Sequence, residues 1–67
     1  MKHLRMRLLR QDKGWTLQNV GDAIGLNKTA VHDIETGRRK PSYDVLVRLE
    51  NLFQKSHRYL LEQVDEN

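Results

Sequence analysis

The sequence of 67 residues contains no cysteine, one proline, four glycines and few aromatic residues. The lack of cysteine excludes a disulfide framework and a thiolate metal site, and it fits a reducing compartment. No apolar run approaches the roughly 18 residues of a membrane span. Arg5, Arg7 and Arg10 interrupt the apolar residues near the N-terminus, so no signal peptide is expected. The length predicts one domain, residues 1–67, with a modest core.

Positive charge is concentrated in the first part of the chain. The formal net charge is +3, from 12 Lys and Arg against 9 Asp and Glu. Residues 1–40 have a net charge of +5, whereas residues 41–67 have a net charge of −2. Such asymmetry favours a polyanionic partner, either nucleic acid or an anionic membrane. The alternative is chance clustering of cations on a solvated surface.

Glycine, proline and helix-capping residues divide the chain into five short helices. Gly14, Gly25 and Gly37 are placed as helix stops. Apolar residues recur at helical spacing, and no segment alternates with period two over enough residues to predict a strand. The expected helices cover about residues 2–13, 16–24, 27–36, 42–53 and 56–64.

The four later helices each begin with a residue suited to cap them, namely Thr16, Asn27, Ser42 and Ser56. In the second helix Asn19 replaces the Glu or Gln of a full capping box, so a weaker cap is expected there. The second and third helices are separated only by residues 25–27. So short a connection predicts that these two helices meet at a steep angle.

The third predicted helix has two different sides. Val31 and Ile34 point the same way and are expected to be buried. The other side presents a row of polar side chains: Lys28, Thr29, His32 and Asp33. Three cations follow in the next loop: Arg38, Arg39 and Lys40. The pattern favours a helix that faces an anionic partner; the alternative is a solvated helix face followed by a basic loop.

Patterns for catalysis, metal binding or cofactor binding are weak. His3, His32 and His57 lie far apart and have no second ligand three or four residues away, so no metal site is expected. The segment GDAIGLNKT has the wrong spacing for a phosphate loop and follows a helix instead of a strand. Ser42 and Ser56 have capping roles and no plausible His or Asp partners. The sequence therefore predicts neither an enzyme nor a cofactor.

Two helices joined by a tight turn, about residues 16–36, form a helix-turn-helix pattern. From about Leu9 to Leu61 the chain resembles the phage repressor/Cro-like helix-turn-helix family, often called the XRE family. The resemblance rests on LRQDKGWT, AIGLNKTAVHDIETGRRKPS and LVRLENLF, and the ending I-E-x-G-x-x-x-P at residues 34–41 is quite specific. The resemblance implies an all-α, five-helix, lambda-repressor-like domain whose third helix enters the DNA major groove.

The resemblance also implies roles for individual residues. The third helix would read base edges with Lys28, Thr29, His32 and Asp33. Phosphates would be bound by Arg10, Gln18, Asn27, Arg38, Arg39 and Lys40. Arg10 and Glu35 match a pair that the family joins by a partly buried salt bridge.

The sequence departs from the family pattern at two positions. Leu17 stands where the family often has a phosphate-binding Gln, and Gln18 comes one residue later. Gly21 replaces the Ala that usually packs the two helices together, at a cost of about 1 kcal/mol in helix propensity.

The expected function is that of a bacterial or phage transcriptional regulator, repressor-like or Cro-like, that binds specific double-stranded DNA in the cytoplasm, associated with the nucleoid. A homodimer on an inverted repeat is expected, because small DNA-binding domains gain affinity and site size by dimerising. Leu60, Leu61 and Val64 are the candidate dimer contacts, although some of them must lie in the core. One alternative is an antitoxin that binds a toxin and its own operator. Another is a protein-interaction adaptor. The cations that accompany the polar row argue against this alternative.

Overall fold

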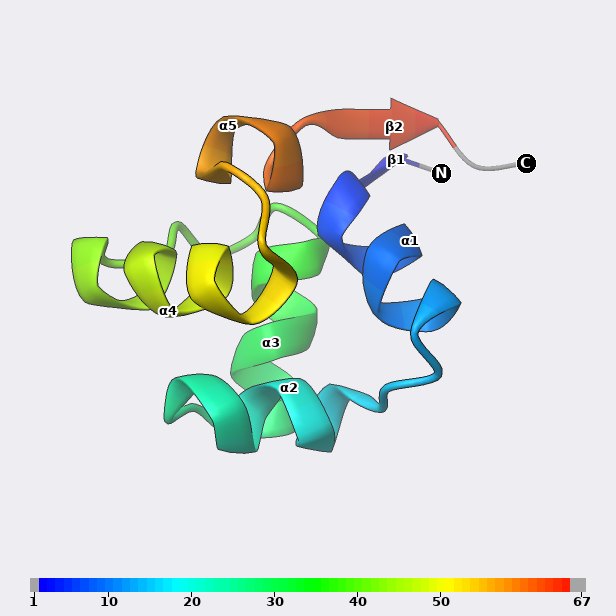
Figure 1. Cartoon of the computed structure of the whole chain (residues 1–67). Coiled ribbons are helices and arrows are strands. Elements are labelled where there is room, and N and C mark those ends of the chain that lie inside the picture. Colours follow the sequence, from blue (N-terminus) through cyan, green and yellow to red (C-terminus); the bar gives the residue numbers. More distant parts are fainter. Residues whose placement is uncertain (1, 66–67) are drawn as a thin grey trace.

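The described part of the chain folds into five helices and one small two-stranded sheet (Figure 1). The structure, a computed structural model, describes residues 2–65. The helices are α1 (Arg5–Asp12), α2 (Leu17–Ile24), α3 (Lys28–Glu35), α4 (Tyr43–Phe53) and α5 (His57–Leu60). In Figure 1, α3 stands between α1 and α4, α2 crosses at one end of α3, and α5 and the sheet lie toward the other end. Five helices were expected, and residues 2–65 contain five.

The two ends of the chain differ from the prediction. Lys2–Leu4 forms strand β1 instead of the first turn of a helix, and Gln63–Asp65 forms strand β2 instead of the last turn of one. The strands pair antiparallel, with His3 opposite Val64. His3 and Leu4 are adjacent and both buried, so the segment lacks the period-two alternation that reveals a strand in a sequence. The pairing joins residues about sixty positions apart, which local sequence does not encode.

Side-chain caps start the later four helices as expected, and the cap of α2 is stronger than expected. Thr16 Oγ1 accepts a hydrogen bond from the Asn19 N–H (3.0 Å), and Asn19 Oδ1 accepts one from the Thr16 N–H (2.9 Å). Asn19 therefore completes a capping box in the place of Glu or Gln, and the prediction of a weaker cap is wrong. The Asn19 side chain is long enough for its amide oxygen to reach the backbone N–H of Thr16.

Gly21 is required by the close approach of α2 to the turn that follows it. The Leu26 N–H donates to the Gly21 carbonyl (2.9 Å), which folds the turn back onto α2. A Cβ atom at position 21 would overlap the Leu26 carbonyl oxygen. Gly25 ends α2 with φ +77°, a left-handed conformation that glycine adopts without strain. Gly21 and Gly25 together allow the steep angle between α2 and α3.

All five helices contribute to one hydrophobic core. Its fully buried members include Met6, Val20, Ile24, Val31, Ile34, Leu49 and Leu60. The Trp15 ring packs on Phe53, with 5.6 Å between ring centroids, and closes the core beside α2. Each large apolar side chain buried in this way stabilises the fold by about 1.5–3 kcal/mol. Within residues 2–65, no helix has the length and apolar character needed to cross a bilayer.

The candidate dimer residues of the C-terminal segment differ in exposure. Leu60 is 0% exposed and belongs to the core, so its assignment to a dimer surface is wrong. Leu60 is buried because α5 packs against α4 and α1, and this side chain, the last of α5, is directed toward them. Leu61, which follows α5, and Val64, in β2, are half-buried.

Candidate nucleic-acid interface

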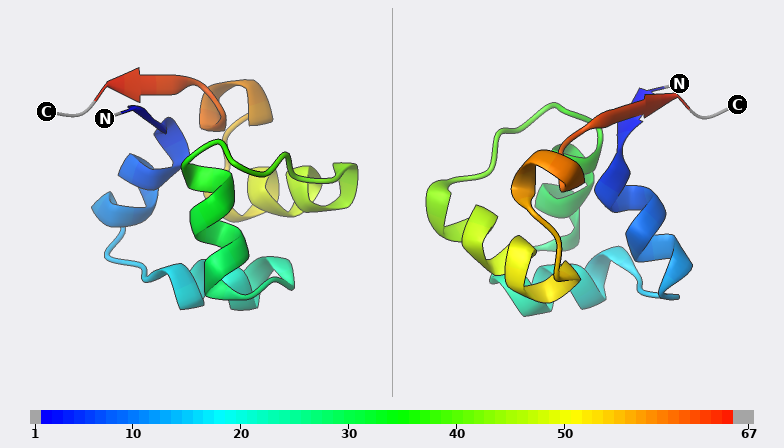
Figure 2. Two further views of the ribbon diagram at one scale, coloured as in Figure 1. Left: turned by 180° about the vertical axis from the view of Figure 1, so that it is seen from behind. Right: turned by 45° about the horizontal axis from the view of Figure 1, so that its top comes forward.

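α3 stands out on one face of the molecule. Seen from behind, it lies in front of the other helices, and the loop that follows it runs along the same face (Figure 2, left). Lys28, Thr29 and His32 are exposed and Asp33 is half-buried. Val31 and Ile34 are 0% exposed and hold the opposite side of α3 in the core. The structure therefore places the four predicted base-reading side chains at the surface of one protruding helix.

The beginning of α3 is held by a cap and by the preceding turn. Asn27 Oδ1 accepts from the Ala30 N–H (2.8 Å), which leaves the side-chain NH2 group of Asn27 as its hydrogen-bond donor. From α4, Arg48 Nη1 donates to the Ile24 carbonyl (3.1 Å) at the C-terminal end of α2. A cation at that position also interacts favourably with the helix dipole. The cap fixes the start of α3, and the Arg48 contact holds the end of α2 against α4.

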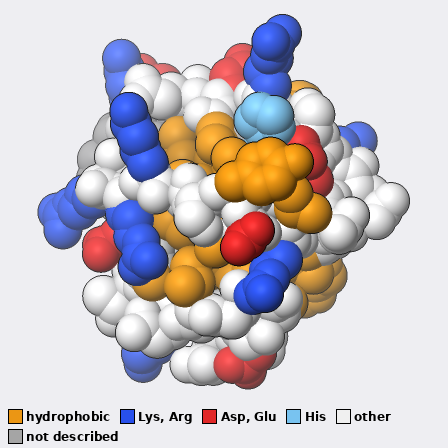
Figure 3. Space-filling view, turned by 90° about the vertical axis from the view of Figure 1, so that its left-hand side faces the viewer, with side chains coloured by type: hydrophobic (Ala, Val, Ile, Leu, Met, Phe, Trp, Pro, Cys, Tyr) orange, Lys and Arg blue, Asp and Glu red, His pale blue; other side chains and the backbone are white. Residues whose placement is uncertain are grey.

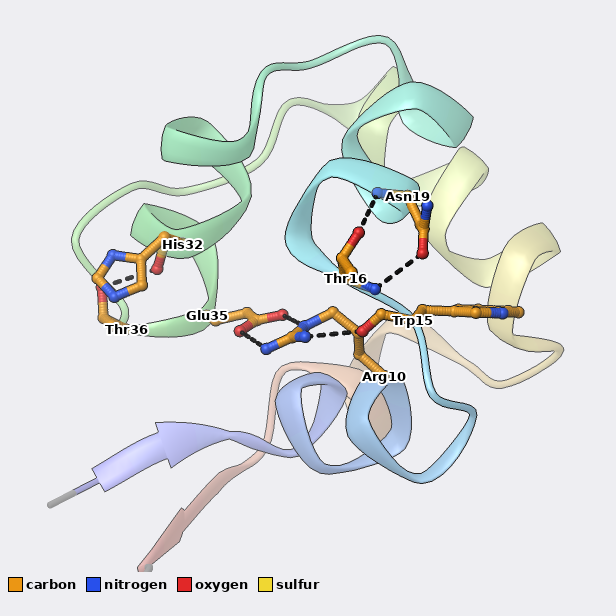
Figure 4. A network of polar contacts seen from close by, with 7 residues as sticks. All are labelled: Arg10, Trp15, Thr16, Asn19, His32, Glu35 and Thr36. Atoms are coloured by element: carbon orange, nitrogen blue, oxygen red, sulfur yellow. Dashed lines mark hydrogen bonds and ion pairs between the residues drawn. The ribbon is translucent and has the colours of Figure 1, made fainter.

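The end of α3 is joined to α1 by the expected ion pair (Figure 4). Arg10 Nε lies 2.7 Å from Glu35 Oε2, and Arg10 Nη2 lies 3.3 Å from Glu35 Oε1. Arg10 Nη1 also donates to the Trp15 carbonyl (2.9 Å) in the segment between α1 and α2. One guanidinium group therefore connects α1, the start of α2 and the last turn of α3.

Burial of this pair changes the role expected of Arg10. The side chain of Arg10 is only 11% exposed, and that of Glu35 is 1% exposed. Three N–H groups of Arg10 are already used inside the protein, and its charge is balanced by Glu35. A buried charge depends on its partner, because removal of one member leaves the other uncompensated. The geometry favours a structural role for Arg10 over a direct phosphate contact.

The cationic loop is folded back onto the end of α3. Thr36 Oγ1 donates to the His32 carbonyl (3.0 Å), and the N–H groups of Arg38 and Arg39 both donate to the Asp33 carbonyl (2.8 and 3.2 Å). Gly37, with φ +80°, permits this reversal of the chain. The side chains of Arg38, Arg39 and Lys40 are exposed. The loop thus presents three cations at a fixed position next to the polar row.

Gln18 lies in the first turn of α2 and is exposed. Its Nε2 group donates to Asp22 Oδ1 (2.8 Å), one turn later on the same helix. This hydrogen bond occupies one of the two N–H groups of the amide and leaves the other for a phosphate. Gln18 and Asn27 are therefore both accessible, as a phosphate contact requires.

The sequence did not predict the role of one residue that positions the candidate site, Arg48. Arg48 reads there as an ordinary surface cation on α4, yet it reaches the end of α2 across 24 positions of sequence. It also lines a pocket of about 340 Å³ between α2 and α4, together with Ala23, Asn51 and Leu52. No local pattern reveals such a contact, because it depends on how α4 packs against α2. Among the described residues, His, Asp and Glu do not gather in groups of three that could hold a metal ion.

Comparisons with known proteins agree with this geometry. A helix-turn-helix family model matches residues 6–60. The HTH-type transcriptional regulator AnsR of Bacillus subtilis (strain 168) is 39% identical over 49 residues, which is 73% of this chain and 42% of AnsR. The uncharacterised HTH-type transcriptional regulator YqaE of the same organism is 33% identical over 57 residues, 85% of this chain and 49% of YqaE. The chain thus spans less than half of the length of these two relatives.

A solved structure has the same fold. The restriction-modification controller protein C.AhdI from Aeromonas hydrophila superposes with a TM-score of 0.73 and 28% identity, over 85% of this chain and 86% of that chain. The predicted all-α helix-turn-helix fold class is confirmed, with the small β1–β2 sheet as an addition. The family match covers most of the chain, from α1 to α5. This chain therefore belongs to the XRE-type helix-turn-helix family.

Proposed function

We propose that the chain is a transcriptional regulator that binds specific sequences of double-stranded DNA through α3. The observation that carries the proposal is the polar row on a protruding helix that is anchored at both ends. A helix of this kind fits the major groove of B-DNA, where each base pair presents a distinct pattern of donors and acceptors. The family of the chain supports the same function.

In this proposal the polar row reads base edges. Lys28 donates to guanine O6 or N7, and Asp33 accepts from cytosine N4. Thr29 bonds a base or contacts a thymine methyl group, and His32 donates from a ring nitrogen.

The surrounding groups bind phosphates and set the register of the helix without reading sequence. They are Gln18, Asn27, Arg38, Arg39 and Lys40, all of which are exposed. Arg10 keeps α3 in place through Glu35 and is assigned no phosphate of its own.

We further propose that two copies bind an inverted repeat, with half-sites about one helical turn apart. With Leu60 in the core, two candidate dimer surfaces remain: the half-buried Leu61 and Val64 near β2, and the exposed apolar side chains of α4 on another side of the molecule. Tyr43 is 78% and Val47 37% exposed, and they lie one turn apart on α4. The side of the molecule where α4 begins shows apolar side chains with Lys, Arg, Asp or Glu, and His side chains around them (Figure 3). A regulator of this kind acts in the cytoplasm, where it meets the nucleoid DNA.

The direct test is selection of bound sequences from a random pool of duplex DNA. The wild-type protein is expected to enrich one palindromic motif. Lys28→Ala is expected to enrich an altered motif, because it removes a base contact and leaves the cationic loop intact. Uniform, unselective enrichment by the wild-type protein would refute the proposal and favour a protein-interaction adaptor.

A further inference from the structure

We propose that His32 makes DNA recognition by α3 proton-linked, so that the protonated imidazole binds its base pair more tightly than the neutral ring. The inference rests on the proposed function, because it places His32 against DNA. It adds a property that the helix-turn-helix arrangement by itself does not require: an affinity and a base preference that change between about pH 5 and 8.

The position of His32 gives its ring access to a partner. The side chain is 53% exposed and belongs to the polar row of α3. The backbone of His32 is held in place, because its carbonyl accepts hydrogen bonds from the Thr36 N–H and from Thr36 Oγ1, both 3.0 Å away. The imidazole points away from the Arg10–Glu35 contact (Figure 4). The ring is thus carried by a hydrogen-bonded part of α3 and remains open to solvent.

The charged groups near His32 include the cations of the loop after α3, Arg38, Arg39 and Lys40. Asp33 Oδ1 lies 4.0 Å from His32 Nδ1, and Lys28 lies one turn earlier on α3. α1, α2 and β1 pack against α3. Of the charged groups that these elements carry, Arg10 pairs with Glu35, Arg5 with Glu62 and Asp22 with Gln18, and His3 of β1 is buried. The others are Lys2 of β1 and Arg7 and Asp12 of α1. These neighbours are present with and without DNA, so a change in protonation on binding must come from the DNA itself.

The chemistry of the two forms of the ring differs at a base edge. A neutral imidazole has one donor and one acceptor, whereas an imidazolium has two donors and a positive charge. The phosphates of DNA favour the charged form, since an opposite charge nearby stabilises it. The major-groove edge of guanine presents two acceptors, N7 and O6, which suit a donor-only group. Lower pH should therefore strengthen binding and increase the preference for guanine at the base pair that His32 contacts.

The test compares affinities for the selected site between pH 5.5 and 8.0 at constant ionic strength, measured by fluorescence anisotropy. The wild-type protein should bind about three- to tenfold tighter per subunit at the lower pH, as one linked proton allows. His32→Gln, which stays neutral and can still bond a base, should lose most of this change. His57→Gln is the matched control, because His57 is 55% exposed and also lies beside a carboxylate, but on α5. It should keep the pH dependence of the wild-type protein.

A second measurement does not depend on a variant. NMR titration of the His32 Cε1 proton, in free and DNA-bound protein, reports protonation of the wild-type ring directly. A higher titration midpoint in the complex supports the inference, and a midpoint unchanged by DNA overturns it. Specific binding that does not vary with pH, or a pH dependence kept in His32→Gln, also overturns it and leaves the proposed function intact. Absence of sequence-specific binding at every pH refutes the proposed function as well.

Discussion

Arg10 and Glu35 form a buried ion pair in which two donors of the guanidinium lie 2.7 and 3.3 Å from the two carboxylate oxygens. The two residues are 25 positions apart and join α1 to the last turn of α3. The side chain of Glu35 is 1% exposed, so its charge depends on Arg10 for compensation. The contact therefore holds the proposed reading helix in place.

We expect Glu35→Ala to destabilise the fold strongly, by about 3–5 kcal/mol, because it leaves the Arg10 charge buried without its partner. The double variant Arg10→Met/Glu35→Leu should be more stable than Glu35→Ala, since it removes both charges together. Urea unfolding followed by circular dichroism measures both effects.

Glu62→Gln provides a matched control on a second pair. Arg5 Nη2 lies 3.1 Å from Glu62 Oε1, but these side chains are 28% and 55% exposed. Water screens that interaction, so its loss should be small beside that of the buried pair. Equal losses in the two single variants would show that burial does not give the Arg10–Glu35 pair its importance.

Asp33→Ala should relax base preference at one position of each half-site, with about 1–3 kcal/mol of discrimination lost there. Its binding to unrelated DNA should not weaken, because the substitution removes a negative charge from a surface that faces a polyanion. Binding to the selected site and to its single-base variants measures the change.

Arg39→Ala is the contrasting variant, because it removes a phosphate contact and no base contact. It should weaken binding to all sequences nearly alike and reduce the slope of log K against log[salt] by about one per subunit. If both variants keep the base-preference profile of the wild-type protein, α3 is not the reader.

Val47→Glu should weaken assembly on DNA, because a two-fold interface would bring two copies of the new carboxylate together. A loss of roughly tenfold or more in affinity for the full inverted repeat is expected, with half-site binding changed little. Sedimentation of the protein–DNA complex should give two chains per optimal site for the wild-type protein.

Gln11→Glu introduces the same charge at an exposed position on α1 and serves as the control. It should leave the stoichiometry at two chains per site. A wild-type complex with one chain per optimal site would contradict the dimer outright, whatever the variants do.

Stability should decrease in acid partly through Glu50. The His57 N–H donates to Glu50 Oε2 (2.6 Å), and His57 Nδ1 lies 2.8 Å from the same oxygen. The backbone N–H first, and the imidazole second, lower the pKa of Glu50 from its ordinary value of 4.5. A lowered carboxyl pKa contributes stability above the unfolded value, and this contribution is lost as the pH falls through the folded value.

Glu50→Gln should therefore show a smaller decrease in Tm than the wild-type protein between pH 5 and pH 3, as measured by thermal circular dichroism. Its Tm at pH 6 should be lower than that of the wild-type protein, because the charged acceptor for His57 is gone. Asp12→Asn removes a carboxylate at the end of α1 and controls for net charge. An unchanged acid dependence in Glu50→Gln would show that the His57–Glu50 contact does not link α4 to α5 in solution.

Much of the helix-turn-helix unit could be predicted from sequence because its signals are local. Asn27 caps α3, Gly25 ends α2, and the spacing of Val31 and Ile34 separates a buried side from the polar row. The same logic failed where a contact is not local. His3 and Val64 pair across the two ends of the chain, and Arg48 reaches the end of α2 from α4.

The sequence by itself determined the approximate places of the five helices, the residues that cap the later four and the identity of the polar row, because these depend on side chains within about one turn of each other. Only the tertiary structure decided which apolar residues near the C-terminus remain available for contacts with a second copy of the chain. Leu60 entered the core, whereas Leu61 and Val64 stayed half-buried. It also decided how deeply the expected Arg10–Glu35 pair is buried, which favours a structural role for Arg10. Burial and ion pairing depend on how separate helices meet, and helical periodicity does not specify that geometry.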